Sequence, residues 1–241
     1  TSKVAPSHSK QVAGGVYASL PHDISISVEG YYKSMRDILE YGGEAAMFPP
    51  IDDWETTFLQ GKGRSYGLEL SFIYNGTIFT GEAYYTLSKT ERFFEDICEN
   101  WYPDRNDNRH KINIQGAWKI GERIDLSAAW VCHSGNRWTM PTHVAILPGG
   151  RIEEMYSSPY NAQMPAVHRL DLGFNYRKQT KRGFESIWNV SIYNVYCRMN
   201  PIMAYAKMGV YDVTTDTMTP YHGVAMGLLP IIPSFSYTLK F

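Results

Sequence analysis

The feature that most constrains the fold is a strict alternation of apolar and polar residues. The last seven residues, FSYTLKF, place an aromatic residue or leucine at every odd position from Phe235 to Phe241 and a polar residue at every even one. Successive side chains of a strand point to opposite faces, so this segment has one apolar and one polar face. Because chain ends fray unless they are held, we predict that this strand pairs into a sheet through its final residue.

The same alternation recurs along the chain in 24–32, 65–74, 111–120 and 169–176. These segments reach about ten residues, longer than the typical strand of about five or six. The pattern predicts nine strands, near 8–20, 23–35, 64–75, 77–90, 109–120, 123–137, 166–178, 184–207 and 220–241.

The connections between these strands alternate between short and long. Tight hairpin turns are predicted at Pro21-His22, Asn75-Gly76, Gly121-Glu122 and Gln179–Arg182. Long connections are predicted at 36–63, 91–108 and 138–165. All tight turns therefore lie at one end of an antiparallel sheet and all long loops at the other, as in outer-membrane barrels with short periplasmic turns and long external loops.

Composition excludes one class of membrane protein and leaves another open. The chain has no apolar run of about 18 residues, so it contains no membrane-spanning helix. Lipid contacts only every second residue of a barrel strand, so a transmembrane β-barrel escapes this test. Its 18 Tyr, 10 Phe and 6 Trp favour strands. The net charge of −1 gives no indication of nucleic-acid binding.

Aromatic residues gather toward the predicted strand ends, as they do at membrane interfaces. Tyr32, Tyr66, Trp118, Trp130 and Trp188 are examples. A soluble β-sandwich, barrel or propeller with an aromatic core would show the same period, because alternation does not say which face is inside. The separation of short turns and long loops to opposite ends of the sheet, together with the length of the strands, favours the membrane interpretation.

Several segments together resemble the C-terminal barrel of TonB-dependent outer-membrane receptors, in particular the SusC-like and related branch. They are GKGRSYGLEL, GEAYYTLSKTERFFEDI, WYPDRNDNRHKINI, SGNRWTMP, NVSIYNVYCRMNP and PIIPSFSYTLKF. They occur in the family's order from about residue 8 to Phe241. The tyrosine-rich strand leads to Lys89, and a charged stretch ending in Arg109-His110 opens the next strand.

The resemblance implies a wall segment of a larger barrel. Such receptors have about 22 strands around an N-terminal plug, and nine strands are too few to close that barrel. Residues 1–241 would then be the C-terminal part of one barrel domain, with the plug and the remaining strands outside this sequence. A C-terminal aromatic such as Phe241 resembles the signal read by the outer-membrane assembly machinery, and its strand would close the barrel against the first one.

The function implied by the resemblance is TonB-dependent uptake of a nutrient (a glycan, iron chelate, cobalamin or peptide) across the outer membrane of a Gram-negative bacterium. The implied partners are the plug, outer-membrane lipid or lipopolysaccharide, the TonB complex and a surface lipoprotein. A passive pore or adhesin barrel is an alternative with the same wall. No enzymatic activity, cofactor or nucleic-acid partner is expected.

Two groups of residues are candidates for the site. Loop aromatics that could stack on a ligand are Trp54, Trp101 and Tyr102. Polar residues expected to face the lumen are Glu29, Glu69, Glu82, Asn113, Gln115, Arg169, Asp171 and Asn175.

Residues suited to covalent or metal chemistry are scattered. His168 and Asp171, three apart on one strand, face oppositely, as do His133 and Ser134. Cys98, Cys132 and Cys197 fit no metal pattern and are predicted to be free thiols.

Two further motifs are given structural interpretations. GKGRSYG misses the glycine spacing of a nucleotide-binding loop and is interpreted as a structural loop segment. The oxygen-rich DRNDNRH lacks the glycine and glutamate of an EF-hand and is interpreted as a solvated loop in which Arg105 and Arg109 pair with its own acids.

Overall fold

The computed structural model describes residues 4–42, 54–148, 152–180, 183–207, 209, 211–212, 214, 217–218 and 221–241. Within them the chain is all-β, with one short 3-10 helix, η1 (Trp54–Thr57), and no α-helix. No helix in these ranges has the length and apolar character needed to cross a membrane.

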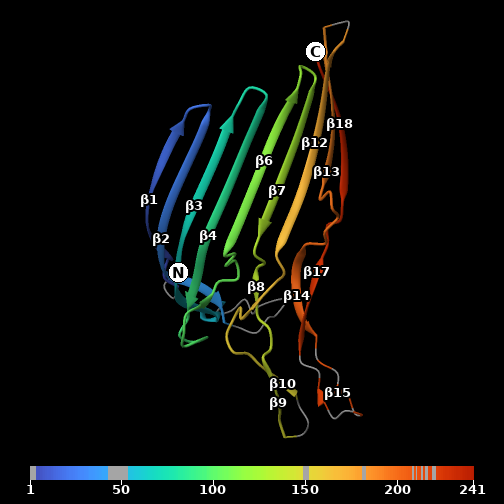
Figure 1. Ribbon diagram of the computed structural model, residues 1–241. Helices are drawn as coiled ribbons and strands as arrows, with labels where there is room; N and C mark the ends of the chain where they lie inside the picture. Colours follow the sequence, from blue (N-terminus) through green and yellow to red (C-terminus); the bar gives the residue numbers. More distant parts are fainter. Residues whose placement is uncertain are drawn as a thin grey trace.

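Nine strands form the main sheet in the order β1-β2-β3-β4-β6-β7-β12-β13-β18, and each pairs antiparallel with its neighbours. Their bounds are β1 (His8–Leu20), β2 (Ile24–Tyr41), β3 (Phe58–Asn75), β4 (Phe79–Phe93), β6 (His110–Ile120), β7 (Ile124–His133), β12 (Val167–Gln179), β13 (Glu185–Tyr193) and β18 (Ile232–Lys240). Figure 1 shows them side by side as one curved wall with β1 and β18 at its edges. The predicted antiparallel all-β sheet is confirmed, and in this chain the sheet is open.

Smaller ladders extend the wall at one end. They are β5 (Tyr102–Pro103) on β4, β8 (Arg137–Trp138) with β11 (Ala162–Gln163), β9 (His143–Ile146) with β10 (Ile152–Met155), β14 (Pro201–Lys207) with β17 (His222–Gly227), and β15 (Tyr211–Asp212) with β16 (Thr217–Met218). In Figure 1 they lie at the lower end of the wall, and the hairpin turns lie at the upper end. The predicted sorting of short turns and long loops is therefore confirmed.

Several predicted strands differ in extent: the predicted strand 123–137 ends as β7 at His133, and two others are each divided. The segment 184–207 divides into β13 and β14, and 220–241 divides into β17 and β18. The first break begins at Asn194, which has a φ of 56° just after the end of β13. Its buried amide Nδ2 then donates to the carbonyl oxygens of Arg198 (2.9 Å) and Leu229 (3.0 Å), which ties the two interrupted segments together.

Two of the predicted long connections, 36–63 and 91–108, are shorter than expected, because β2 continues to Tyr41, β3 begins at Phe58 and β4 continues to Phe93. The residues GKGRSYG consequently lie inside β3, and their interpretation as a structural loop segment is wrong. A side chain at Gly61 would lie 2.6 Å from the Phe94 ring, so the absence of one makes room for that ring.

A β-bulge interrupts the pairing of β2 with β3 between Arg36 and Ile38. Asp37 is the extra residue and has a φ of 54°. A bulge shifts the alternation by one residue, so Glu40 points to the face that odd residues such as Glu29 occupy earlier in the same strand. This switch brings Glu40 to the ion pairs described below.

The register gives the main sheet two distinct faces. Residues paired directly across antiparallel strands share a face. All eight residues predicted to face a lumen lie on one face, here called the polar face; the register Glu29↔Glu69 and Glu82↔Gln115 illustrates it. The opposite, apolar face carries Val28, Leu70, Ile114, Leu172 and Phe235 among others.

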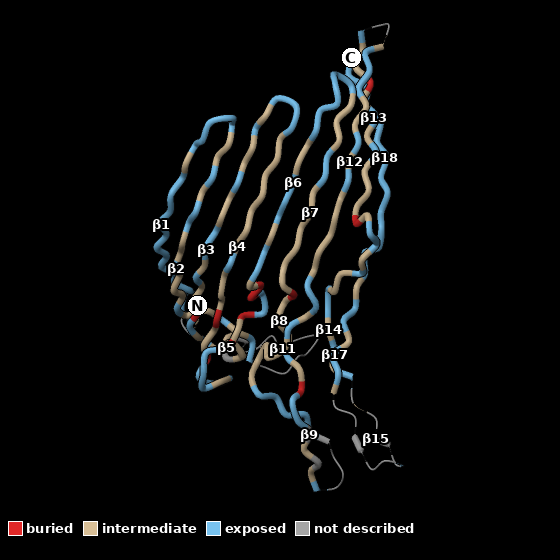
Figure 2. The backbone as a smooth tube through the Cα atoms, viewed as in Figure 1, coloured by how far each residue is buried: buried red, intermediate tan, exposed pale blue. Residues whose placement is uncertain are grey.

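Little of the chain is buried, because the wall is one sheet thick. In Figure 2 most buried positions lie toward the loop end, and Ser186 and Asn194, at the two ends of β13, are also buried. Within the described residues, the large apolar side chains in the buried class are Phe94 (0% exposed) and Tyr102 (2%). The packed interior of this chain is thus a cluster at the loop end of the polar face.

The C-terminal strand behaves largely as predicted. β18 pairs with β13 from Tyr193↔Ile232 to Glu185↔Lys240. Phe241 follows the end of the strand, is 97% exposed and contacts the Phe184 ring edge-to-face at 6.4 Å. The pairing therefore extends to the penultimate residue, one short of the prediction.

Candidate functional site

The candidate site is the loop end of the polar face, where the segment 94–109 folds back against β4. β5 in this segment pairs with the end of β4 through Arg92↔Tyr102 and Glu91↔Pro103. The pairing holds the segment over the polar face instead of extending it away from the sheet. The interpretation of DRNDNRH as a solvated loop is wrong, since Asp104, Asp107 and Asn108 are buried.

Arg92 stands at the centre of this fold-back. Its Nη1 donates to Glu40 Oε2 at 2.5 Å, and its Nε donates to Asp104 Oδ2. One guanidinium thus joins the end of β2, the end of β4 and the folded-back segment. Charge-assisted hydrogen bonds in a partly dehydrated setting are stronger than neutral ones, so this triad fixes the segment in place.

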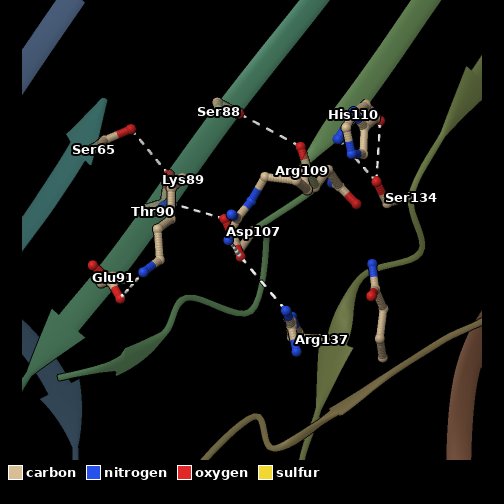
Figure 3. Close-up of polar contacts among 12 residues, drawn as sticks. Ser65, Ser88, Lys89, Thr90, Glu91, Asp107, Arg109, His110, Ser134 and Arg137 are labelled. Atoms are coloured by element: carbon tan, nitrogen blue, oxygen red, sulfur yellow. Dashed lines mark hydrogen bonds and ion pairs between the residues drawn. The ribbon is translucent and has the colours of Figure 1, made fainter. Parts of the chain in front are cut away.

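Asp107 is the second anchor and is 2% exposed. Its Oδ1 accepts from the Thr90 backbone amide at 2.9 Å, and its Oδ2 lies 3.3 Å from Arg109 Nη2 and 3.9 Å from Arg137 Nη2 (Figure 3). The predicted pairing of Arg109 with an acid of its own segment is confirmed. The carboxylate of Asp107 connects β4, the folded-back segment and β8.

Aromatic rings fill the space beside these ion pairs. The Tyr102 ring lies 6.5 Å from Phe94 and 6.3 Å from Tyr160, centroid to centroid. Burial raises the pKa of both phenols, and the nearby Glu40 carboxylate raises it further. Both tyrosines are therefore neutral at physiological pH and act as packing groups.

The aromatic residues predicted to stack on a ligand are Trp54, Trp101 and Tyr102. Tyr102 is enclosed by the cluster, so its ring faces are occupied by protein. Trp101 is 38% exposed and packs against Phe93 (5.7 Å) and the Arg64 guanidinium (4.3 Å), on the apolar side of the wall. Trp54 begins η1, and its side chain lies outside the described part of the chain. The structure does not bring Trp101 and Tyr102 to one surface, because Trp101 lies on the apolar side and Tyr102 within the cluster on the polar face.

The polar face farther from the loops holds a second group of candidate residues. Gln115 Nε2 donates to Glu82 Oε2 at 2.6 Å, and Asn189 Nδ2 donates to Asn175 Oδ1 at 2.7 Å. Arg169 Nε donates to Asp171 Oδ2 at 2.9 Å. Most of the predicted lumen residues are thus linked to polar neighbours on the same face.

A groove of about 480 Å³ runs across the polar face between β4 and β13. Glu82, Gln115, Asp171 and Asn189 supply its polar groups. Small residues such as Ala129 and Gly173 form its floor, which leaves room for a docked segment or ligand.

In the part of the chain that the structure describes, the histidines considered for covalent chemistry have other partners. His168 bonds to Tyr196 Oη (3.0 Å), and Asp171 pairs with Arg169 on the other face. Within the described ranges no three His, Cys, Asp or Glu side chains converge as metal ligands. The three cysteines are free, as predicted.

Arg92 and Asn194 were not singled out by the sequence analysis, and Asp107 was considered there only as part of DRNDNRH. Strand parity could have placed Arg92 on the polar face, since it lies ten residues after Glu82 on the same strand. Nothing in the alternation indicates its partner Glu40, because the bulge at Asp37 changes the face of that residue.

Comparison with known proteins adds a likeness of fold. No protein-family model and no curated protein sequence matches the chain. The structure is similar to the FrpB iron transporter from Neisseria meningitidis (F3-3 variant), with a TM-score of 0.53 and 11% sequence identity. The match covers 82% of this chain and 28% of that one, so this chain spans less than a third of the length of its neighbour.

Proposed function

We propose that this chain forms part of the wall of an outer-membrane transport receptor that imports a nutrient with energy relayed by TonB. In this proposal the chain is the C-terminal part of a larger plugged barrel in a Gram-negative bacterium. The likeness of fold to a transporter supports the class. The cargo is left open, because iron belongs to the name of a neighbour that shares 11% identity.

The observation that carries the proposal is the apolar face. Leu68, Phe72, Ile114, Leu172 and Phe174 are between 37% and 47% exposed on three different strands of that face. Soluble monomers rarely expose a continuous apolar surface of more than a few hundred Å². A lipid bilayer removes the cost of this exposure.

The height of the apolar face fits a bilayer. On β3, Tyr66 and Tyr74 bracket Leu68, Leu70 and Phe72. Eight residues span about 27 Å at about 3.4 Å per residue. With a strand tilt of about 40°, this corresponds to about 21 Å along the membrane normal, close to the apolar band of about 25 Å in outer-membrane barrels.

The polar face supports a role in binding and gating without covalent chemistry. The Arg92 triad and Asp107 hold the segment 94–109 over the loop end of that face, where an external entrance to the lumen would lie. The groove around Glu82 and Asp171 would then receive the plug or the cargo. The surface lipoprotein, the TonB complex and the assembly machinery that reads Phe241 complete the proposed set of partners.

The proposal is tested by fractionating cells of the source organism and probing with antibody to this segment. We expect one band, from a protein much longer than 241 residues, confined to the outer-membrane fraction. A band of 27.5 kDa in a soluble fraction would contradict the proposal.

Energy coupling requires a second measurement. The detergent-solubilised protein is expected to bind the purified periplasmic domain of TonB. An outer-membrane location without TonB binding would instead support the passive pore.

A further inference from the structure

Five cations gather on the apolar face just beyond the edge of the apolar band. They are Lys10 on β1, Arg36 on β2, Lys62 and Arg64 on β3, and Lys89 on β4, and together are called the outer basic cluster. The register Tyr32↔Tyr66↔Lys89 marks the row at the band edge. Lys10↔Ser34↔Arg64 forms the next row toward the loops, and Arg36↔Lys62 the row after it.

Arg36 and Lys62 face each other directly across β2 and β3. Like charges in directly opposed positions repel and destabilise a sheet. Neither residue forms an ion pair with an acid among the residues that the structure describes. An anion bound between them would offset this repulsion.

Arg64, by contrast, is held in a fixed position. Its Nη2 lies 2.7 Å from Glu91 Oε2, its Nε donates to the same oxygen at 2.8 Å, and its guanidinium stacks on the Trp101 ring. Lys89 Nζ lies 2.7 Å from the other oxygen of Glu91. One buried carboxylate therefore positions two of the five cations.

A cleft of about 470 Å³ lies between β2 and β3 at the outer basic cluster. Three cations line it, Arg36, Lys62 and Arg64, against one carboxylate, Asp37, with Trp101 at its side. The stacked rings of Tyr32 and Tyr66, 6.4 Å apart, adjoin it toward the apolar band. The cleft thus combines excess positive charge with an apolar floor on one side.

We propose that the outer basic cluster binds the phosphate groups of a membrane lipid headgroup, with the acyl chains lying along the apolar face. The proposal rests on the proposed function in one respect, that this face contacts lipid. Arg36 and Lys62 lie four residues beyond Tyr32 and Tyr66, about 13 Å along the strand. That step carries them from the band edge into the headgroup layer, where clustered Lys and Arg bind anionic lipid.

Phosphate is the anion that fits the donor set. Guanidinium groups match phosphate oxygens with paired, charge-assisted hydrogen bonds, and ammonium groups add point charges. A lipid carrying two phosphates could be bound by Arg36 and Lys62 at one end and by Arg64 and Lys89 at the other. Trp101 and the two tyrosines would contact the glycerol or sugar between headgroup and chains.

The test uses native mass spectrometry of the full-length protein in detergent, with bisphosphorylated lipid A as the probe. We expect wild type to retain the lipid. The double variant Arg36→Gln/Lys62→Gln should bind it more weakly, with the affinity reduced by at least about 5-fold for each cation removed. The charge-preserving Arg36→Lys/Lys62→Arg should retain most binding. The matched control is Lys111→Gln/Lys178→Gln, which removes two cations elsewhere on the wall and should bind as wild type does.

Three outcomes would overturn the inference. The first is that the Gln double variant retains lipid A as well as wild type does. The second is that the Lys111→Gln/Lys178→Gln control loses as much lipid A binding as the Gln double variant does. The third is that wild type retains lipid A from which the phosphates have been removed. Displacement of the lipid by inorganic phosphate at equal concentration would assign the site to free phosphate instead of lipid. The heat-dependent change in gel mobility should be the same for each variant as for wild type, which verifies that the variant is folded. If wild type fractionates with the outer membrane yet binds no lipid A, the lipid site fails and the transport proposal stands.

Discussion

Arg92 Nη1 lies 2.5 Å from Glu40 Oε2, although 52 residues separate the two in sequence and β3 lies between their strands. The contact exists because the bulge at Asp37 turns Glu40 to the polar face. Through Asp104, the same guanidinium also holds the folded-back segment 94–109. This relationship decides how the loop end of the wall is shaped.

Replacing Arg92 by Gln is expected to release the segment 94–109 while leaving the sheet intact. Asp104 would lose its ion pair in a buried position. We expect a local cost of about 1–3 kcal/mol, below the range for fully buried pairs because Arg92 keeps 29% of its side chain exposed. Hydrogen exchange of the amides between residues 94 and 108 should accelerate by about 5- to 150-fold. Arg177→Gln, at an exposed pair with Asp125, is the control and should change nothing at the loop end.

Leu70→Arg is expected to block membrane assembly. A cation in the middle of a lipid-facing strand costs about 2–4 kcal/mol. The matched control is Glu69→Arg, one residue away at the same depth on the polar face, where it replaces a carboxylate opposite Glu29. The measurement is the amount of SDS-resistant protein in the membrane fraction. If the Leu70 variant assembles as well as the Glu69 variant, the apolar face does not contact lipid.

Gly61→Ala is expected to destabilise the loop end by overpacking. The added methyl group would lie 2.6 Å from both the Phe94 ring and the Phe93 carbonyl oxygen. Such overpacking costs about 1–3 kcal/mol. Gly14→Ala on β1 is the control, because a Cβ there meets nothing within 4 Å. The midpoint of urea unfolding, followed by tryptophan fluorescence, should fall for Gly61→Ala and stay unchanged for Gly14→Ala.

Two substitutions at Asn194 separate the contribution of its backbone angle to stability from that of its hydrogen bonds. Asn194→Gly keeps access to a φ of 56° and loses the bonds to Arg198 and Leu229, whereas Asn194→Ala loses both. Losing the buried bonds costs about 1–3 kcal/mol, and a positive φ adds about 1 kcal/mol or more for alanine. The free energy of unfolding should therefore decrease in the order wild type, Gly, Ala. Equal stability of Gly and wild type would show that the bonds contribute nothing.

The buried phenol of Tyr102 predicts a loss of stability at high pH. Its pKa is raised by burial, so it stays protonated in the folded protein at pH values where the unfolded phenol, with a pKa near about 10, ionises. Proton release then favours the unfolded state, so stability falls as pH rises above about 10 and is unaffected below it. Tyr102→Phe should flatten this dependence. The measurement is the urea midpoint between pH 8 and 11.5 for both proteins.

Much of the fold follows from residues close together in sequence. The alternation from Tyr66 to Tyr74 predicted both the strand and its apolar face, because the period of two is a property of the extended backbone. The turn near Gly121, which has a φ of 71°, was equally local. The same periodicity grouped all eight polar residues from Glu29 to Asn175 on one face.

The candidate site depended on contacts that no local pattern contains. A single bulged residue, Asp37, reversed the face of Glu40, and alternation carries no signal for such an insertion. Asn194 lies at the break after β13, and its amide donates to the carbonyl oxygen of Leu229, 35 residues away at the other break. Tyr102 was predicted on an external loop and lies enclosed, because β5 folds back onto β4.

The sequence by itself thus determined the strands, their two faces and the end of the sheet at which the loops lie, since these depend on a backbone repeat and on turn residues. The tertiary structure alone decided which charges meet. The Arg92 triad on the polar face and the opposed Arg36 and Lys62 on the apolar face both arise from register between strands, and register is set only when the strands pair.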